Sequence, residues 1–194
     1  MKRRDAVGAM ALASLTAAFR WSPAEAERAA EFVRKALRTQ YVPTFFTSHE
    51  WETVRVLVDI VIPRDERSGS ATDAGVPEFM DFMMNDRPDG QTPMRGGLEW
   101  LDGECFDRTG KTFLDSTDAE RAAVLDDIGW PKKARPDMSQ GVAFFNMFRD
   151  LTASGFFTSK TGIADLDYRG NEFVGEWKGC PEEALRKLGV NYED

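Results

Sequence analysis

Apolar residues recur at helical spacing along most of the chain, and one stretch shows the pattern most clearly. In TSHEWETVRVLVDIVIP, residues 47–63, apolar side chains recur every three or four positions, and Pro63 ends the run. Thr47 and Glu50 fit a capping box, which is typical of a helix start. We therefore expect a helix here that buries one apolar face. That face consists of Trp51, Val54, Leu57, Val58 and Val61.

Five more stretches have the same spacing and complete a helical body. Pro77 stands where a helix tolerates a proline, at its first position. Thr117 and Glu120 form a second capping box. The five stretches are residues 24–37, 77–86, 92–106, 117–129 and 141–155. The residues expected on their apolar faces include Phe32, Phe79, Met80, Met94, Leu98, Leu101, Phe106, Phe144, Phe145, Phe148 and Leu151.

The sequence pattern changes after Gly155. Residues 156–181, FFTSKTGIADLDYRGNEFVGEWKGCP, are rich in glycine and aromatic residues and lack a helical period. A short last helix, EEALRKLG, is expected over residues 182–189. No stretch shows the sustained alternation of a strand. The prediction is an all-α domain of about six helices with an irregular, aromatic and glycine-rich C-terminal arm.

The composition narrows the classes of partner. A chain of 194 residues suits one domain with a sizeable core. Its net charge of −8, from 33 acidic and 25 basic residues, argues against nucleic acid and against an anionic membrane surface as partners. Five Trp and 14 Phe indicate either a large aromatic core or an aromatic face that another molecule covers.

The first residues have the pattern of an export signal. Arg3 and Arg4 precede an uncharged apolar stretch, and Ala24-Glu25-Ala26 has the small-x-small pattern of a cleavage site. The apolar stretch is too short to span a bilayer, which takes about 20 residues. We expect a twin-arginine signal over residues 1–26, export to the periplasm, and one helical domain over residues 27–194. An ordinary amphipathic helix with a basic start is the alternative.

Few residues offer catalytic chemistry. The one histidine, His49, lies in the first turn of a predicted helix, where an exposed or locally packed side chain is expected. The chain contains no haem-attachment motif and no glycine-rich phosphate or dinucleotide motif. Asp59 stands out inside an apolar helix, and we expect it to be exposed or bonded to a backbone N–H. No catalytic, cofactor-binding or metal-binding residue is predicted in this chain.

The two cysteines, Cys105 and Cys180, leave three alternatives open. In an oxidising compartment they can pair with each other, and the chain-entropy model gives such a bond about 4 kcal/mol of stabilisation. One of them can instead bond to a partner subunit. Both can also remain buried thiols, since sequence does not give the geometry that a disulfide requires.

Three stretches together resemble the small subunit, subunit 3, of the gluconate 2-dehydrogenase family. They are the leader MKRRDAV, the run LVDIVIPRDERSGSATDAGVPEFMDFMM at residues 57–84, and FFTSKTGIADLDYRGNEFVGEWKGCP at residues 156–181. The second is similar to the family's helix, Ile-Pro stop, acidic loop and second helix. The third is similar to its Phe-Thr-Ser arm, which ends in Trp, Gly, Cys and Pro.

The resemblance implies a function that the residues alone do not. It implies a small subunit without a cofactor of its own, which binds a large FAD-dependent subunit of the glucose–methanol–choline type. This subunit would help the flavoprotein to mature and supply its twin-arginine signal. The flavoprotein would oxidise a sugar, sugar acid or glycoside and pass electrons to a c-type cytochrome or another carrier. A free-standing exported binding or scaffold protein is the alternative, and an enzyme that uses Asp59 is the third.

The aromatic arm supplies the predicted partner interface. Exposed apolar patches usually mark interaction surfaces, and aromatic residues dominate the energetics of interfaces. The alternative is that these rings pack on the chain's own helices. The predicted interface residues are Phe156, Phe157, Tyr168, Phe173 and Trp177.

Overall fold

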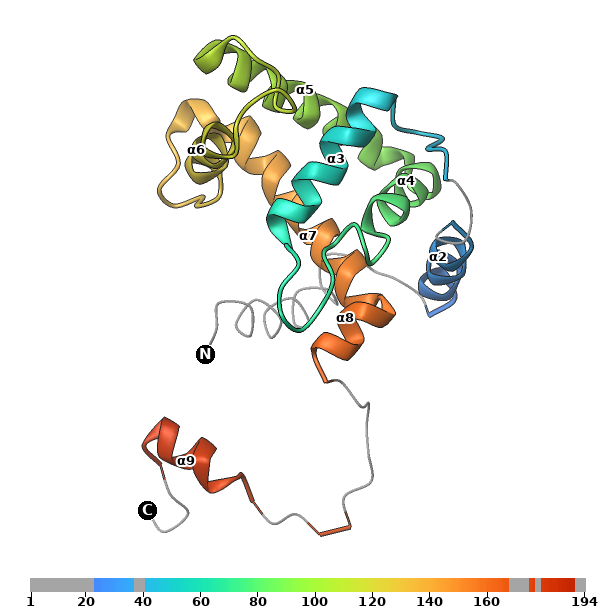
Figure 1. The fold of residues 1–194 in the computed structure, drawn as a ribbon, viewed down its shortest axis with the longest axis vertical. Coiled ribbons are helices and arrows are strands. Elements are labelled where there is room, and N and C mark those ends of the chain that lie inside the picture. Colours follow the sequence, from blue (N-terminus) through green and yellow to red (C-terminus); the bar gives the residue numbers. More distant parts are fainter. Residues whose placement is uncertain (1–22, 37–40, 168–174, 177–178, 191–194) are drawn as a thin grey trace.

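The computed structural model describes residues 23–36, 41–167, 175–176 and 179–190. These residues form α-helices and two short 3-10 helices, with no strand among them, which confirms the all-α prediction (Figure 1). None of the described helices is both long and apolar enough to cross a membrane. The α-helices are α2 (Pro23–Ala36), α3 (Ser48–Val61), α4 (Val76–Asp86), α5 (Gln91–Thr109), α6 (Asp118–Ile128), α7 (Ser139–Thr158), α8 (Lys160–Asp165) and α9 (Glu182–Leu188); the 3-10 helices are η1 (Pro88–Gly90) and η2 (Pro136–Met138).

Both predicted capping boxes are present. The Thr47 hydroxyl accepts a hydrogen bond from the Glu50 N–H at 3.3 Å, and the Glu50 carboxylate accepts one from the Thr47 N–H at 2.8 Å. Thr117 and Glu120 repeat the arrangement at the start of α6, at 3.3 and 2.6 Å. Each box satisfies N–H groups that a helix start would otherwise leave unpaired.

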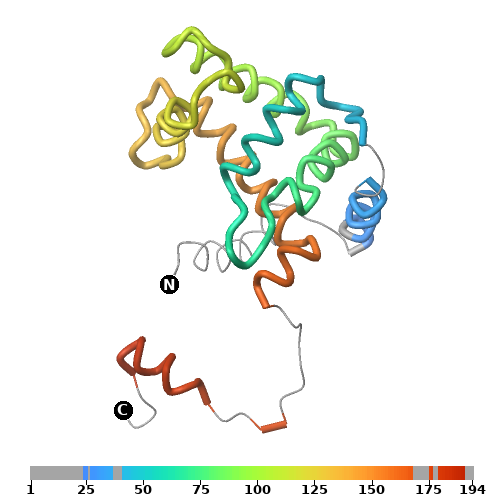
Figure 2. The backbone as a smooth tube through the Cα atoms, in the orientation of Figure 1, coloured from blue at the N-terminus to red at the C-terminus, as the bar shows by residue number. Residues whose placement is uncertain are grey.

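Helix α7 is the centre of the body. It contacts α3, α4, α5, α6 and α8, and Figure 2 shows its path across the body behind α3. Phe148, Leu151 and Phe156 on α7 are at most 2% exposed. Burying such large side chains is the main source of stability in a domain of this size. The predicted apolar face of α7 is therefore the face that organises the core.

The C-terminal region differs from the prediction of an irregular arm beginning at residue 156. Helix α7 continues to Thr158, and α8 follows after Ser159, whose hydroxyl accepts from the Gly162 N–H at 3.1 Å. The prediction was wrong for residues 156–165 because the Phe156 and Phe157 rings pack into the core, and this packing keeps the chain helical. The predicted last helix is confirmed as α9, and none of its residues is buried.

Two glycines allow α5 and α7 to pack closely. A Cβ atom at Gly97 would overlap the Phe144 ring, and one at Gly141 would overlap the Trp100 ring. Each glycine thus faces an aromatic ring of the opposite helix. Gly103, also on α5, is exposed and has nothing within 4 Å of a Cβ position.

We expect Gly97→Ala and Gly103→Ala to change stability in opposite directions. Gly97→Ala should lower the free energy of unfolding by about 1–3 kcal/mol, because the Phe144 ring must move. Gly103→Ala should raise it by about 0.5–1 kcal/mol, because alanine is the better helix former at an open position. Urea unfolding followed by circular dichroism measures both. Equal effects of the two variants would contradict the close packing of α5 on α7.

Candidate functional site

The most highly connected polar group in the described chain is the Asp81 carboxylate on α4. Its side chain is fully buried. One oxygen accepts from the Tyr41 hydroxyl at 2.6 Å and from the Thr44 N–H and hydroxyl, both at 2.9 Å. The other accepts from the N–H groups of Phe45 at 2.9 Å and Phe46 at 3.2 Å. We call Asp81 and these four donor residues the Asp81 cluster.

The Asp81 cluster holds an ionised carboxylate inside the protein. Burial alone would raise the pKa of Asp81, but the hydrogen bonds from Thr44, Tyr41, Phe45 and Phe46 outweigh it and hold the pKa below its usual value. Burial and the adjacent carboxylate raise the pKa of the Tyr41 hydroxyl far above its usual range. Neither group is poised to exchange a proton near neutral pH, so the cluster is structural.

Aromatic rings surround the Asp81 cluster and connect it to three helices. The Tyr41 ring lies 5.9 Å from the Phe32 ring of α2 and 5.5 Å from the Trp51 ring of α3, centroid to centroid. Phe32 also lies 4.9 Å from Phe82 of α4. From α5, the Arg95 guanidinium donates to the Phe45 carbonyl at 2.7 Å and stacks over the Phe45 ring. Segment 41–46 therefore joins four helices.

Glu78, one turn before Asp81 on α4, is in the opposite situation. It is partly buried, and its Oε2 atom has no hydrogen-bond partner within the described residues. Burial raises the pKa of Glu78 above its usual value, and the nearby Asp81 charge raises it further. The backbone N–H of Glu78 and the Arg55 charge lower this pKa, but by less. The folded protein thus stabilises the charge of Asp81 and disfavours that of Glu78.

The single histidine forms a pair with an aspartate. His49 Nε2 lies 2.5 Å from Asp102 Oδ2, and Asp102 Oδ1 accepts from the Phe113 N–H at 2.8 Å. A catalytic pair of this kind needs a hydroxyl or thiol next to the imidazole. The hydrogen bonds of the described residues place none there. The pair joins α3 to α5 and, through Asp102, to the α5–α6 connection, and the His49 side chain is exposed, one of the two situations expected for it.

Asp59 also has the structural role that the sequence favoured. It is partly buried, and its Oδ1 atom accepts from the Thr72 N–H at 2.7 Å, which fixes the loop after α3. Within the described residues, no group of three or more His, Cys, Asp or Glu side chains is placed to hold a metal ion.

The structure separates the two cysteines, both of which lie in its described part. Cys105 on α5 is 1% exposed, Cys180 is exposed, and no disulfide joins them. Burial raises the pKa of the Cys105 thiol, which keeps it protonated and unreactive. Of the three alternatives, the internal disulfide is not formed in this structure, and that of two buried thiols is wrong because Cys180 is exposed. The bond to a partner subunit stays a prediction.

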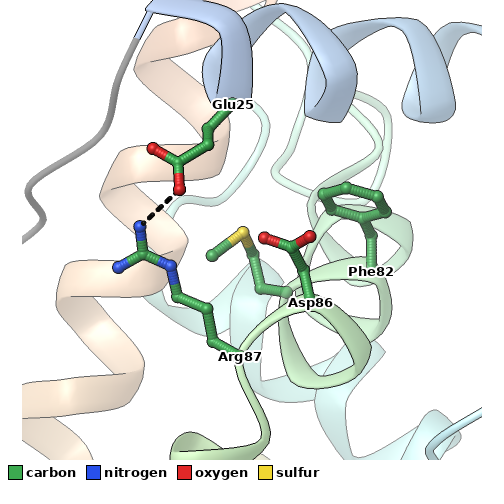
Figure 3. A pocket seen from close by; sticks show the side chains of 5 residues that line it. Glu25, Phe82, Asp86 and Arg87 are labelled. Atoms are coloured by element: carbon green, nitrogen blue, oxygen red, sulfur yellow. Dashed lines mark hydrogen bonds and ion pairs between the residues drawn. The ribbon is translucent and has the colours of Figure 1, made fainter.

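A shallow hollow lies between α2 and α4 (Figure 3). Arg87 at the end of α4 reaches Glu25 of α2 at 3.5 Å across it. The hollow encloses no space for even a water-sized molecule, so it is not a ligand pocket of the usual kind. The predicted boundary between residues 26 and 27 falls within α2, so Glu25 already belongs to the folded body.

The residues predicted to face a partner have different outcomes. Phe156 is 0% and Phe157 7% exposed, so both belong to the core, and the prediction that they contact a partner was wrong. They follow the stated alternative, because α8 folds back over the end of α7. The other predicted residues lie outside the described part of the chain: Tyr168, Phe173, Trp177 and the signal residues Arg3 and Arg4.

The structure brings forward two features that the sequence analysis did not single out. The first is Asp81, whose signal was a carboxylate placed between Met80 and Phe82 in an apolar helical run. The second is a set of exposed aromatic side chains. The prediction that Phe106 lies on the buried face of α5 was wrong, because its ring is 62% exposed, and Trp130 after α6 is 59% exposed. These rings are open to another molecule, whereas Phe156 and Phe157 are not.

Comparison with known protein families gives a match. The family model described as gluconate 2-dehydrogenase subunit 3 matches residues 48–179, which begin at α3 and run past α8. This match confirms the resemblance drawn from the sequence. Searches of curated proteins and of solved structures give no significant match.

Asp81→Asn tests the Asp81 cluster, with Glu78→Gln as its matched control. Each variant removes one negative charge from α4. Asp81→Asn should lower the free energy of unfolding at pH 7 by about 2–4 kcal/mol, because an amide leaves several buried donors unsatisfied. Glu78→Gln should leave that free energy unchanged or raise it, because burial already disfavours the Glu78 charge.

The pH dependence of the free energy of unfolding gives a second test of the Asp81 cluster. The pKa of Asp81 is lower in the folded chain than in the unfolded one, so its contribution is present at neutral pH and is lost as the pH falls through the folded-state pKa. The gap between wild type and Asp81→Asn should therefore narrow in acid, as measured by urea unfolding. An equal loss of stability in both variants at pH 7 would contradict the assignment.

Proposed function

This chain belongs to the gluconate 2-dehydrogenase subunit 3 family, and from that premise we propose that it is the non-catalytic small subunit of a dehydrogenase complex. The observation that carries the proposal is the family match over the whole helical body from α3 to α8. The catalytic subunit of the complex is proposed to be a large FAD-dependent dehydrogenase of the glucose–methanol–choline type, acting on a sugar, sugar acid or glycoside.

The structural roles of the buried and partly buried polar side chains support this proposal. The Asp81 carboxylate, the His49–Asp102 pair and Asp59 all form hydrogen bonds that fix helices or loops of the chain itself. The buried Cys105 thiol stays protonated. Side chains committed in this way build a rigid body, and a rigid body with exposed aromatic rings suits binding to another protein.

The proposed role has three parts. The chain binds the flavoprotein and stabilises it by mass action, since a ligand of the folded state raises its apparent stability. It carries the export signal for both subunits by the twin-arginine route, which places the complex in the periplasm. The flavoprotein takes the electrons from its substrate and passes them to a c-type cytochrome or another carrier.

Affinity purification from cells that produce the flavoprotein tests the proposal. The tagged full-length chain should bring down a flavoprotein in a fixed stoichiometry, and the eluate should show the absorbance of oxidised flavin. The chain purified without that partner should release no flavin on denaturation and oxidise no sugar.

Two outcomes would contradict the proposal. Flavin held tightly by the chain alone, with turnover of a sugar, would make the chain an enzyme. A stable chain that brings down no flavoprotein from its own host would favour the free-standing binding protein instead.

A further inference from the structure

The connection between α6 and α7 is an exposed loop with an unusual composition. Residues 129–137, GWPKKARPD, lead from α6 into the short helix η2, and we call them the Trp130 loop. The Trp130 ring is 59% exposed, and the side chains of Lys132, Lys133 and Arg135 are exposed around it. Large aromatic and arginine residues at an exposed site are typical of binding hot spots.

Backbone hydrogen bonds and buried residues at both ends restrain the Trp130 loop. The N–H groups of Lys133 and Ala134 donate to the Trp130 carbonyl at 2.8 and 3.0 Å and close a turn. Ile128 before the loop and Met138 after it are at most 4% exposed, so the core fixes both ends. A loop with this degree of order loses little conformational entropy when it binds a partner.

The charge of the Trp130 loop contrasts with that of the chain before it. Residues 99–127 contain nine acidic and three basic side chains. The loop contains three basic residues and one acidic residue, Asp137, which pairs with Arg135 at 3.3 Å. The Lys133 ammonium lies 5.7 Å from the centre of the Trp130 ring. The loop is therefore a small basic and aromatic segment that follows an acidic stretch of the chain.

We propose that the Trp130 loop is the anchor by which this chain docks on the catalytic subunit of its dehydrogenase, with Trp130 entering an apolar pocket rimmed by carboxylates. The inference rests on the proposed function and adds the place and chemistry of the contact. The indole supplies apolar area, and Lys132 and Lys133 supply the charge that a carboxylate rim complements.

The surrounding charge favours a protein partner over a membrane or nucleic acid. Asp126 and Asp127 lie only a few residues before Trp130 and are exposed. Charges act over about 8 Å at physiological salt, so a broad anionic surface that reached the loop would also meet these carboxylates. A protein surface can confine its negative charge to the few ångströms around one pocket.

Charge and ring variants of the full-length chain test the proposal through co-purification with the flavoprotein. The test variants are Trp130→Ala and the double variant Lys132→Glu/Lys133→Glu. The matched controls are Val42→Ala, at an apolar residue 73% exposed, and Arg28→Glu/Lys35→Glu on α2, which makes the same change in net charge. Figure 1 shows α2 on the opposite side of the body from α6.

We expect the two loop variants to bind the flavoprotein at least about tenfold more weakly than wild type, and the controls to bind within about twofold of it. Thermal unfolding should be unchanged in all four, because the altered side chains are exposed. Added salt should weaken the wild-type complex and have less effect on the Lys132→Glu/Lys133→Glu complex.

The possible failures are distinguishable. A wild-type chain that brings down no flavoprotein overturns the proposed function. A wild-type complex that survives both loop variants overturns only the loop assignment. Binding to vesicles of anionic lipid that needs the loop, with unchanged binding to the flavoprotein, would also overturn it and assign the loop to a membrane.

Discussion

One buried carboxylate sets the geometry of the first half of this domain. Asp81 lies inside α4, and the backbone and side chains of segment 41–46 converge on it with five hydrogen bonds. A charge in that position is tolerated only because each donor is in place, since an unpaired buried charge costs several kcal/mol. The same segment presents Tyr41 to the rings of α2 and α3 and the Phe45 carbonyl to Arg95 of α5. One side chain thus anchors the segment that joins these four helices.

Polar groups have different roles in the interior of the protein and on its surface. Inside, the Asp81 carboxylate holds segment 41–46, and α7 provides the apolar surface on which α3, α4, α5, α6 and α8 pack. Outside, the Trp130 loop concentrates an aromatic ring and positive charge directly after an acidic stretch of the chain. A rigid interior and a distinctive exposed loop are the properties that a binding subunit requires, because preorganised contacts bind more tightly than contacts that must first be ordered.

The sequence predicted features that have local causes. The two capping boxes and the spacing of apolar residues specify the starts of α3 and α6 and the buried face of α7, and the structure confirms them.

The errors of the sequence analysis concern features with distant causes. Phe156 and Phe157 stay helical because they pack into a core built by other segments, and local composition does not contain that information. Asp81 was visible as a carboxylate in an apolar run, but its five donors come from residues 35–40 positions earlier in the chain. The family resemblance, by contrast, was recoverable from the sequence because it rests on the order and spacing of motifs.

Hydrogen–deuterium exchange on the chain alone and on its complex with the flavoprotein tests most directly whether the domain is a preformed binding body. We expect the N–H groups of Thr44, Phe45 and Phe46 to exchange slowly in the isolated chain, because Asp81 holds them. Complex formation should then add protection in residues 129–137 and leave those three amides as they were. Fast exchange at the three amides in the isolated chain, followed by protection only in the complex, would show that the body is ordered by its partner and would contradict this view.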